Sequence, residues 1–138
     1  MKMISLSPKR GLSLSNRATG GCQQNHKLML PIFEGLMFQS IAEIALLEAE
    51  SNYTRLHLTN GGQVLVCKTL SSMEDALAPY PQFVRIHRSY LVNLHMAEKY
   101  IRGKGGQVIL QGGRAVNVAN GRKAALMEAL EYCYRSVK

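Results

Sequence analysis

Hydrophobic and polar residues alternate along most of the chain from Lys27 onward, with the period of two that is typical of half-buried β-strands. Turn sequences such as Asn60-Gly61-Gly62 and Gly112-Gly113 interrupt this alternation and favour tight hairpins. We therefore predict a series of short strands joined largely by hairpins. They cover residues 28–33, 36–38, 44–50, 53–59, 63–68, 84–86, 90–93, 99–102, 107–111 and 114–118.

Two segments have the period of an amphipathic helix instead. Leu70, Met73 and Leu77 lie at i, i+3 and i+7, which predicts a short helix capped by Thr69 or Ser71. No long helix separates the strands, as a doubly wound parallel sheet would require. The predicted fold class is therefore mainly β, with about ten short strands, one short helix and a C-terminal helix. The apolar positions that predict the C-terminal helix are residues 126, 130, 133 and 137.

The alternation breaks within one stretch, FVRIHRSYLVNL at residues 83–94. A continuous strand would place Arg88 on the apolar face, where an unpaired guanidinium is costly to bury. We therefore expect two strands, with a kink at His87-Arg88-Ser89 that turns Arg88 outward. The same kink would return Leu91 to apolar neighbours.

Residues 1–26 show neither period and are rich in Ser, Gly, Asn and Gln. We expect a disordered basic tail there, or alternatively an interaction arm, ahead of a single domain at residues 27–138. No apolar run is long enough to span a bilayer, and no export signal is recognisable. Cys22, Cys67 and Cys133 are widely spaced and form no CxxC pair, which favours a reducing cytoplasmic location.

Charge is distributed unevenly along the chain. Among 138 residues, 17 are Lys or Arg and nine are Asp or Glu, which gives a formal net charge of +8. Residues 34–78 contain two basic and six acidic residues, whereas residues 79–138 contain ten basic and three acidic residues. A small domain with this balance commonly binds nucleic acid or another anionic surface. We expect the positive potential on its C-terminal half.

The sequence contains no motif that indicates catalysis. His26, His57, His87 and His95 lack the spacing of metal ligands, and no phosphate-binding glycine loop follows a predicted strand. We therefore predict that the protein is not an enzyme and uses no cofactor, metal ion or small-molecule substrate.

Polar residues gather where the predicted strands are interrupted. Arg and Asn side chains recognise guanine and adenine edges through paired hydrogen bonds, while Ser, Thr, Tyr and Lys side chains suit phosphates. Three of these residues also have a purely structural alternative: Asn52 in a turn, Asn120 as a helix cap, and His87 as a half-buried histidine. The three polar groups are residues 51–54, residues 87–89, and residues 117 and 120–123.

These groups fall within a longer resemblance. From about Leu28 to Leu130 the chain resembles the LytTR DNA-binding domain of bacterial response regulators, and the signature F-x-R-I-H-R-S-Y-L-V-N is its most specific part. The matching motifs are LEAESNYTRLHL at 47–58, VCKTLSSMEDAL at 66–77, FVRIHRSYLVNL at 83–94 and VILQGGRAVNVANGRK at 108–123.

The resemblance implies an elongated, mostly β fold that inserts loop residues into successive major grooves of duplex DNA and bends it. It implies binding as two copies to paired direct-repeat half-sites, and a regulatory protein partner such as a membrane protein. The base-reading residues that it implies are Asn52 or Tyr53, Arg88 and Asn120, and the phosphate contacts are Lys68, His87, Ser89, Arg122 and Lys123.

Two features depart from the family pattern. Many members have Ser-Arg where this chain has Ala119-Asn120, so Asn120 would read a different base or none, and Arg122 could compensate. In addition, the residues ahead of the match are too few to form a phosphate-receiver domain. We therefore expect no regulation by aspartate phosphorylation within this chain.

These observations predict a cytoplasmic, sequence-specific transcription regulator that binds duplex DNA. One alternative is a protein-interaction module that titrates a related regulator, which the changed 119–120 pair keeps open. The other is an RNA-binding module, which would need exposed aromatic side chains for stacking, and the chain has only six Tyr and three Phe residues.

Overall fold

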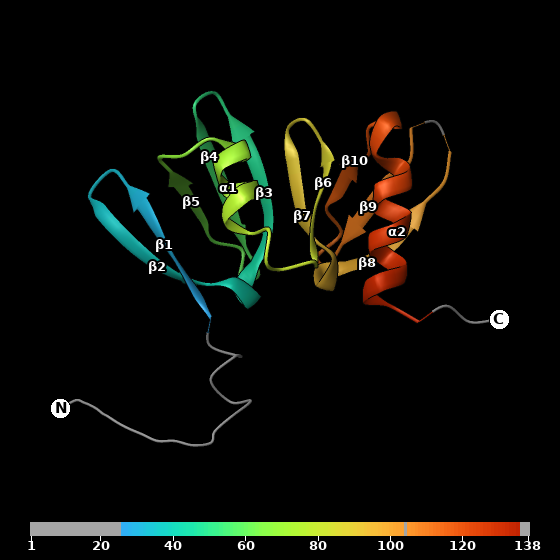
Figure 1. The fold of residues 1–138 in the computed structure, drawn as a ribbon, viewed down its shortest axis with the longest axis horizontal. Helices are drawn as coiled ribbons and strands as arrows, with labels where there is room; N and C mark the ends of the chain where they lie inside the picture. The colour runs from blue at the N-terminus through green and yellow to red at the C-terminus, as the bar shows by residue number, and fades with distance from the viewer. Residues whose placement is uncertain (1–25, 104, 136–138) are drawn as a thin grey trace, which may run out of the picture.

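The computed structural model describes residues 26–103 and 105–135. Residues 1–25 of the predicted tail lie outside this part of the chain, so their disorder stays a prediction. The described residues form ten strands and two α-helices, which confirms the predicted mainly β class (Figure 1). The elements are β1 (Lys27–Ile32), β2 (Gly35–Ser40), β3 (Ile44–Glu50), β4 (Tyr53–Leu58), β5 (Gln63–Val66), α1 (Leu70–Ala76), β6 (Phe83–His87), β7 (Tyr90–Asn93), β8 (Ala97–Ile101), β9 (Gln107–Leu110), β10 (Ala115–Asn117) and α2 (Lys123–Cys133).

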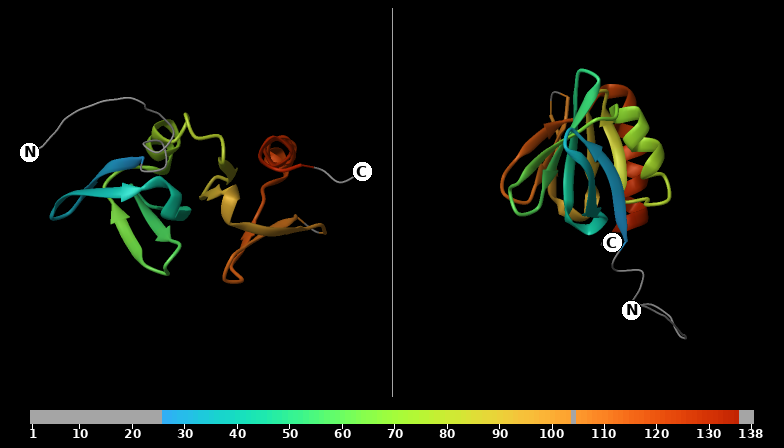
Figure 2. Two further views of the ribbon diagram at one scale, coloured as in Figure 1. Left: turned by 90° about the horizontal axis from the view of Figure 1, so that it is seen from below. Right: turned by 90° about the vertical axis from the view of Figure 1, so that its left-hand side faces the viewer.

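The strands form three antiparallel sheets. A central five-stranded sheet has the order β5-β4-β3-β7-β6, with the hairpin β1-β2 on one flank and the three-stranded sheet β10-β9-β8 on the other. Both helices lie on one side of the sheets, α1 over the N-terminal half and α2 over the C-terminal half (Figure 2). Short 3-10 turns at Ile41–Glu43, Leu94–Met96 and Asn120–Arg122 connect some of these elements.

Two hydrophobic cores fill the molecule, and the strands β3 and β7 contribute to both. Side chains on consecutive strand residues point to opposite faces. Accordingly, Leu47 and Leu91 pack in the core beneath α1, whereas their neighbours Leu46 and Val92 pack in the core beneath α2. All four side chains are buried. The β3–β7 pair therefore separates the two cores, with one core packed on each of its faces.

The broken alternation around Arg88 is the junction of two strands, as predicted. Strand β6 ends at His87 and β7 begins at Tyr90, with a bulge in their pairing between Arg85 and His87. Arg88 is exposed and Leu91 is buried. The bulge shifts the phase of the alternation and gives both residues the environments that they require.

The predicted caps had different outcomes. Thr69 caps α1, because its side-chain oxygen accepts a hydrogen bond from the Ser72 amide at 3.2 Å. The prediction that Asn120 caps the C-terminal helix is wrong. Asn120 begins the 3-10 turn that precedes α2, and Arg122 occupies the N-cap position without a side-chain hydrogen bond.

The sequence pattern also missed two buried polar residues. Asn93 is buried, with its side-chain amide donating to the Ile44 carbonyl at 2.8 Å and its oxygen accepting from the His95 amide at 2.9 Å. Thr54 is buried as well and donates to the Lys68 carbonyl at 2.8 Å. Each of the two buried side chains thereby has a hydrogen-bond partner in the backbone.

The packing of α2 leads to a stability prediction. Leu126 is 0% exposed in the second core, so Leu126→Ala should lower the free energy of unfolding by about 2–5 kcal/mol. Met127, its helical neighbour, is 37% exposed, and Met127→Ala should change it by less than about 0.5 kcal/mol. Urea titrations of both variants measure the difference. Equal losses would show that α2 is not anchored through Leu126.

Candidate nucleic-acid interface

The three polar groups of the sequence come together at one edge of the molecule. The β3–β4 loop, the β6–β7 turn and the segment that leads into α2 all lie at the upper edge in Figure 1. We call this surface the loop edge. It comprises residues 51–53, Lys68, residues 87–89 and residues 120–123.

Strand pairing and two backbone hydrogen bonds fasten the loops to each other. Because β3 and β7 are antiparallel neighbours, the end of β3 lies beside the start of β7. The Ala49 amide donates to the Ser89 carbonyl at 2.8 Å, and the Ala119 amide donates to the Ile86 carbonyl at 2.8 Å. The β6–β7 turn is thus bonded to the elements that carry the other two loops.

The β3–β4 loop is a two-residue connection, because Glu50 pairs with Tyr53. Ser51 has a φ of 57°, a value that favours glycine, and Ser51, Asn52 and Tyr53 are all exposed. The Tyr53 ring lies 5.5 Å from the ring of Phe33, centroid to centroid. The structure therefore supports the turn alternative for Asn52 and still leaves its side chain exposed.

A hydrogen bond from the buried Thr54 hydroxyl to the Lys68 carbonyl holds Lys68 at the same edge. The Thr54–Lys68 hydrogen bond ties the segment after β5 to the start of β4, and Lys68 itself is exposed. The grouping of Thr54 with the DNA-contacting polar residues is therefore wrong. Its hydroxyl is buried and already donates to a carbonyl, which leaves it unable to meet a phosphate.

The β6–β7 turn presents three side chains with different roles. His87 is half-buried, and its Nδ1 accepts a hydrogen bond from the Ser89 amide at 3.1 Å. With Nδ1 as an acceptor, Nε2 is the ring nitrogen that is left to act as a donor. The Arg88 guanidinium makes no ion pair with any residue that the structure describes. Among the described residues its side chain makes no hydrogen bond either, and only its backbone carbonyl is engaged, so within this part of the chain its donors are available to a partner.

The third loop provides polar and basic residues ahead of α2. Asn120 and Gly121 are exposed, and Arg122 and Lys123 are half-buried. Asn117 was predicted in this group but lies on β10, where its side-chain oxygen accepts from the Gln107 amide at 2.9 Å. Asn117 is accordingly part of a cross-strand pair, whereas residues 120–123 belong to the loop edge.

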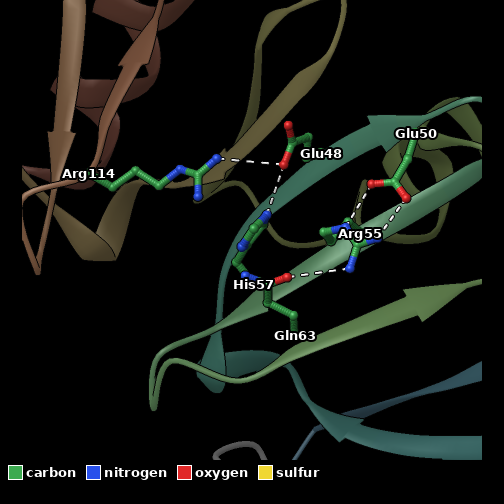
Figure 3. A network of polar contacts seen from close by, with 6 residues as sticks. All are labelled: Glu48, Glu50, Arg55, His57, Gln63 and Arg114. Carbon is green, nitrogen blue, oxygen red and sulfur yellow. Dashed lines mark hydrogen bonds and ion pairs between the residues drawn. The ribbon is translucent and has the colours of Figure 1, made fainter.

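The acidic residues nearest this edge are paired with basic side chains (Figure 3). Arg55 donates to both oxygens of Glu50, at 2.6 and 2.7 Å, and this hydrogen bonding lowers the pKa of the Glu50 carboxyl. Glu48 lies 3.0 Å from His57 Nε2 and 3.6 Å from Arg114 Nη2. These basic partners offset the negative charges of Glu48 and Glu50, so the net charge of the loop edge stays positive.

Other kinds of site have no counterpart in residues 26–103 and 105–135. No group of three or more His, Cys, Asp or Glu side chains there could hold a metal ion. No helix in this part is long and apolar enough to cross a membrane. Cys67 and Cys133 are free, half-buried thiols, and burial raises the pKa of Cys133.

A β-rich domain with polar and basic loops gathered at one edge suits an anionic partner such as nucleic acid. The comparison with protein families is consistent with this class, because the model of the LytTr DNA-binding domain matches residues 34–131. The chain therefore belongs to the LytTR family. This is a family of DNA-binding domains and not of enzymes.

Two known proteins show how far the similarity extends. The CO-responsive transcriptional regulator RcoM of Rhodospirillum rubrum is 35% identical over 97 residues, which are 70% of this chain and 40% of RcoM. A LytTr DNA-binding domain from Bacillus cereus has the same fold, with a TM-score of 0.63 at 19% identity over 75% of this chain and 95% of that one. The chain thus spans less than half the length of its regulator relative.

The backbone of Ser51 generates a prediction about the first loop. A residue with a side chain pays about 1–2 kcal/mol for a left-handed conformation, which glycine adopts freely. Ser51→Gly should therefore raise the free energy of unfolding by about 1 kcal/mol, while Ser51→Ala, which retains Cβ, should leave it nearly unchanged. Chemical denaturation of the two variants checks this. A destabilised glycine variant would contradict a strained loop.

Proposed function

We propose that this protein is a transcription regulator that binds duplex DNA in a sequence-specific manner through the loop edge. One observation carries the proposal: three exposed polar loops from distant parts of the sequence are bonded together at one edge. Membership of the LytTR family and similarity to a transcriptional regulator support it.

The side chains of the loop edge can be assigned to roles by their chemistry. Arg88 lies in the central turn, has no ion-pair partner among the described residues, and suits the paired acceptors of a guanine. Asn52 or Tyr53 on one side and Asn120 on the other would read bases in neighbouring grooves. Phosphate contacts then come from Lys68, His87, Ser89, Arg122 and Lys123, which fix the position of the domain on the duplex.

The proposal extends to how the domain is used. Two copies bind paired direct-repeat half-sites, and a regulatory protein, such as a membrane protein that sequesters the regulator, controls access to the DNA. The domain works in the cytoplasm, where its target DNA lies.

A protein-interaction role has one observation in its favour. Met29 and Phe38 are cross-strand partners on the β1-β2 hairpin and are 63% and 61% exposed, with the exposed Leu36 and Phe33 close by in the sequence. An apolar hairpin face of this kind is typical of a protein contact. Size-exclusion chromatography with and without a selected duplex separates the two roles, since a titrating module would form a complex with another protein and none with DNA.

Arg88→Ala tests the proposed base contact. Selection from random duplexes should recover a defined site with the parent protein, and the variant should lose preference at one position within each half-site. A lost paired contact to guanine costs about 1–3 kcal/mol of discrimination. If both proteins selected identical sites, Arg88 would not read a base.

Lys123→Ala tests the proposed phosphate contact. Its affinity should fall by a similar factor for every duplex, and the slope of log affinity against log salt should decrease by about 1, because one fewer counterion is released. Lys27→Ala is the charge-matched control, since Lys27 is exposed at the start of β1, and this end of β1 lies at the lower side of the molecule in Figure 1, away from the loop edge. Equal slope changes in both variants would place the DNA elsewhere.

A further inference from the structure

The turn that carries Arg88 is held by a second arginine. Arg85, on β6, donates from Nε to the His87 carbonyl at 3.0 Å and from Nη2 to the Arg88 carbonyl at 2.6 Å. Its third nitrogen, Nη1, lies 2.7 Å from a carboxylate oxygen of Glu74 on α1. Each nitrogen of this guanidinium therefore has a partner within the protein.

The chemistry of the turn explains why an arginine is needed. The two carbonyls that accept from Arg85 lie at the end of β6 and in the turn to β7, directly after the bulge between Arg85 and His87. A guanidinium is planar and can direct several donors at fixed angles, which a lysine ammonium cannot do. Glu74 fixes the plane of that guanidinium, and α1 thereby contributes to the geometry of the turn.

Burial separates the roles of the two arginines. The Arg85 side chain is 13% exposed and all of its nitrogens are engaged, whereas Arg88 is exposed and has no ion-pair partner among the described residues. Arg85 is thus poorly placed to contact DNA directly. It is well placed to determine where the backbone presents Arg88.

We propose that Arg85, oriented by Glu74, is a positioning residue that fixes the 87–89 turn and so controls base discrimination through Arg88. The proposal rests on the proposed function for its DNA readout. Its structural part, an ordered turn that depends on the Arg85–Glu74 pair, applies to the free protein as well.

The variants are chosen to separate the contact between Arg85 and Glu74 from effects of net charge. Arg85→Lys retains the positive charge but loses the planar guanidinium and its several fixed donors. Glu74→Gln removes the acceptor charge on α1, and Asp75→Asn is its control, because Asp75 is the exposed neighbour on the same helix and the change in net charge is identical. Any difference between these two variants then reflects the contact with Arg85 and not the overall charge.

Amide exchange in the free protein tests whether Arg85 and Glu74 hold the 87–89 turn in place. The Ser89 amide bonds to His87 Nδ1 within the turn, and the Ala49 amide bonds to the Ser89 carbonyl. Both amides should exchange at least ten-fold faster in Arg85→Lys and in Glu74→Gln, with strand β9 as an unchanged reference and Asp75→Asn like the parent. Unchanged exchange at both amides would overturn the proposal, whatever the protein binds.

A double-mutant cycle on DNA tests the link to Arg88. Arg85→Lys alone should reduce discrimination at the Arg88-dependent base about ten-fold with an unchanged salt slope, and should have no further effect in an Arg88→Ala background. Additive losses, or a reduced salt slope for Arg85→Ala that Arg85→Lys restores, would identify a direct phosphate contact and overturn the positioning role. If the parent selects no duplex, the proposed function fails. The exchange rates alone then show whether the turn depends on the Arg85–Glu74 pair.

Discussion

The two-sided β3–β7 pair is the constraint on which the rest of the structure depends. Leu46 and Leu47 are consecutive and both fully buried, so neither face of β3 can turn to solvent. A one-residue slip would exchange the side chains between the cores, which fixes the register of the pair. Because the register is fixed, the loop that follows β3 and the turn that precedes β7 are held side by side, and the loop edge follows from the packing of the cores.

Much of this fold is predictable from the sequence, because its signals are local. The hairpins at residues 60–62 and 112–113, the Thr69 cap and the interruption at residues 87–89 each depend on residues within one turn or strand. The family motifs add the residue roles, and the structure gathers those residues at one edge. The role of each side chain on DNA remains a prediction.

The features that the sequence did not predict depend on distant partners. Asn93 and Thr54 are polar residues whose burial is stabilised by carbonyls 49 and 14 residues away. Arg85 falls on the polar face of its strand pattern. Its engagement within the protein depends on Glu74, a distant residue on α1. Asn120 has the chemistry of a cap, but a 3-10 turn starts there, beside the hydrogen bond from Ala119 to Ile86.

The backbone bonds between the loops also restrict how such a domain can change its binding site. Adding or deleting a residue in the β3–β4 loop or before α2 would displace the partners of the Ser89 and Ile86 carbonyls, and would disturb the central turn together with the altered loop. Under the proposed function, new target sequences are therefore accessible through exchange of the exposed side chains at fixed loop lengths. The backbone of the loop edge would stay constant, while its exposed side chains could be exchanged one at a time.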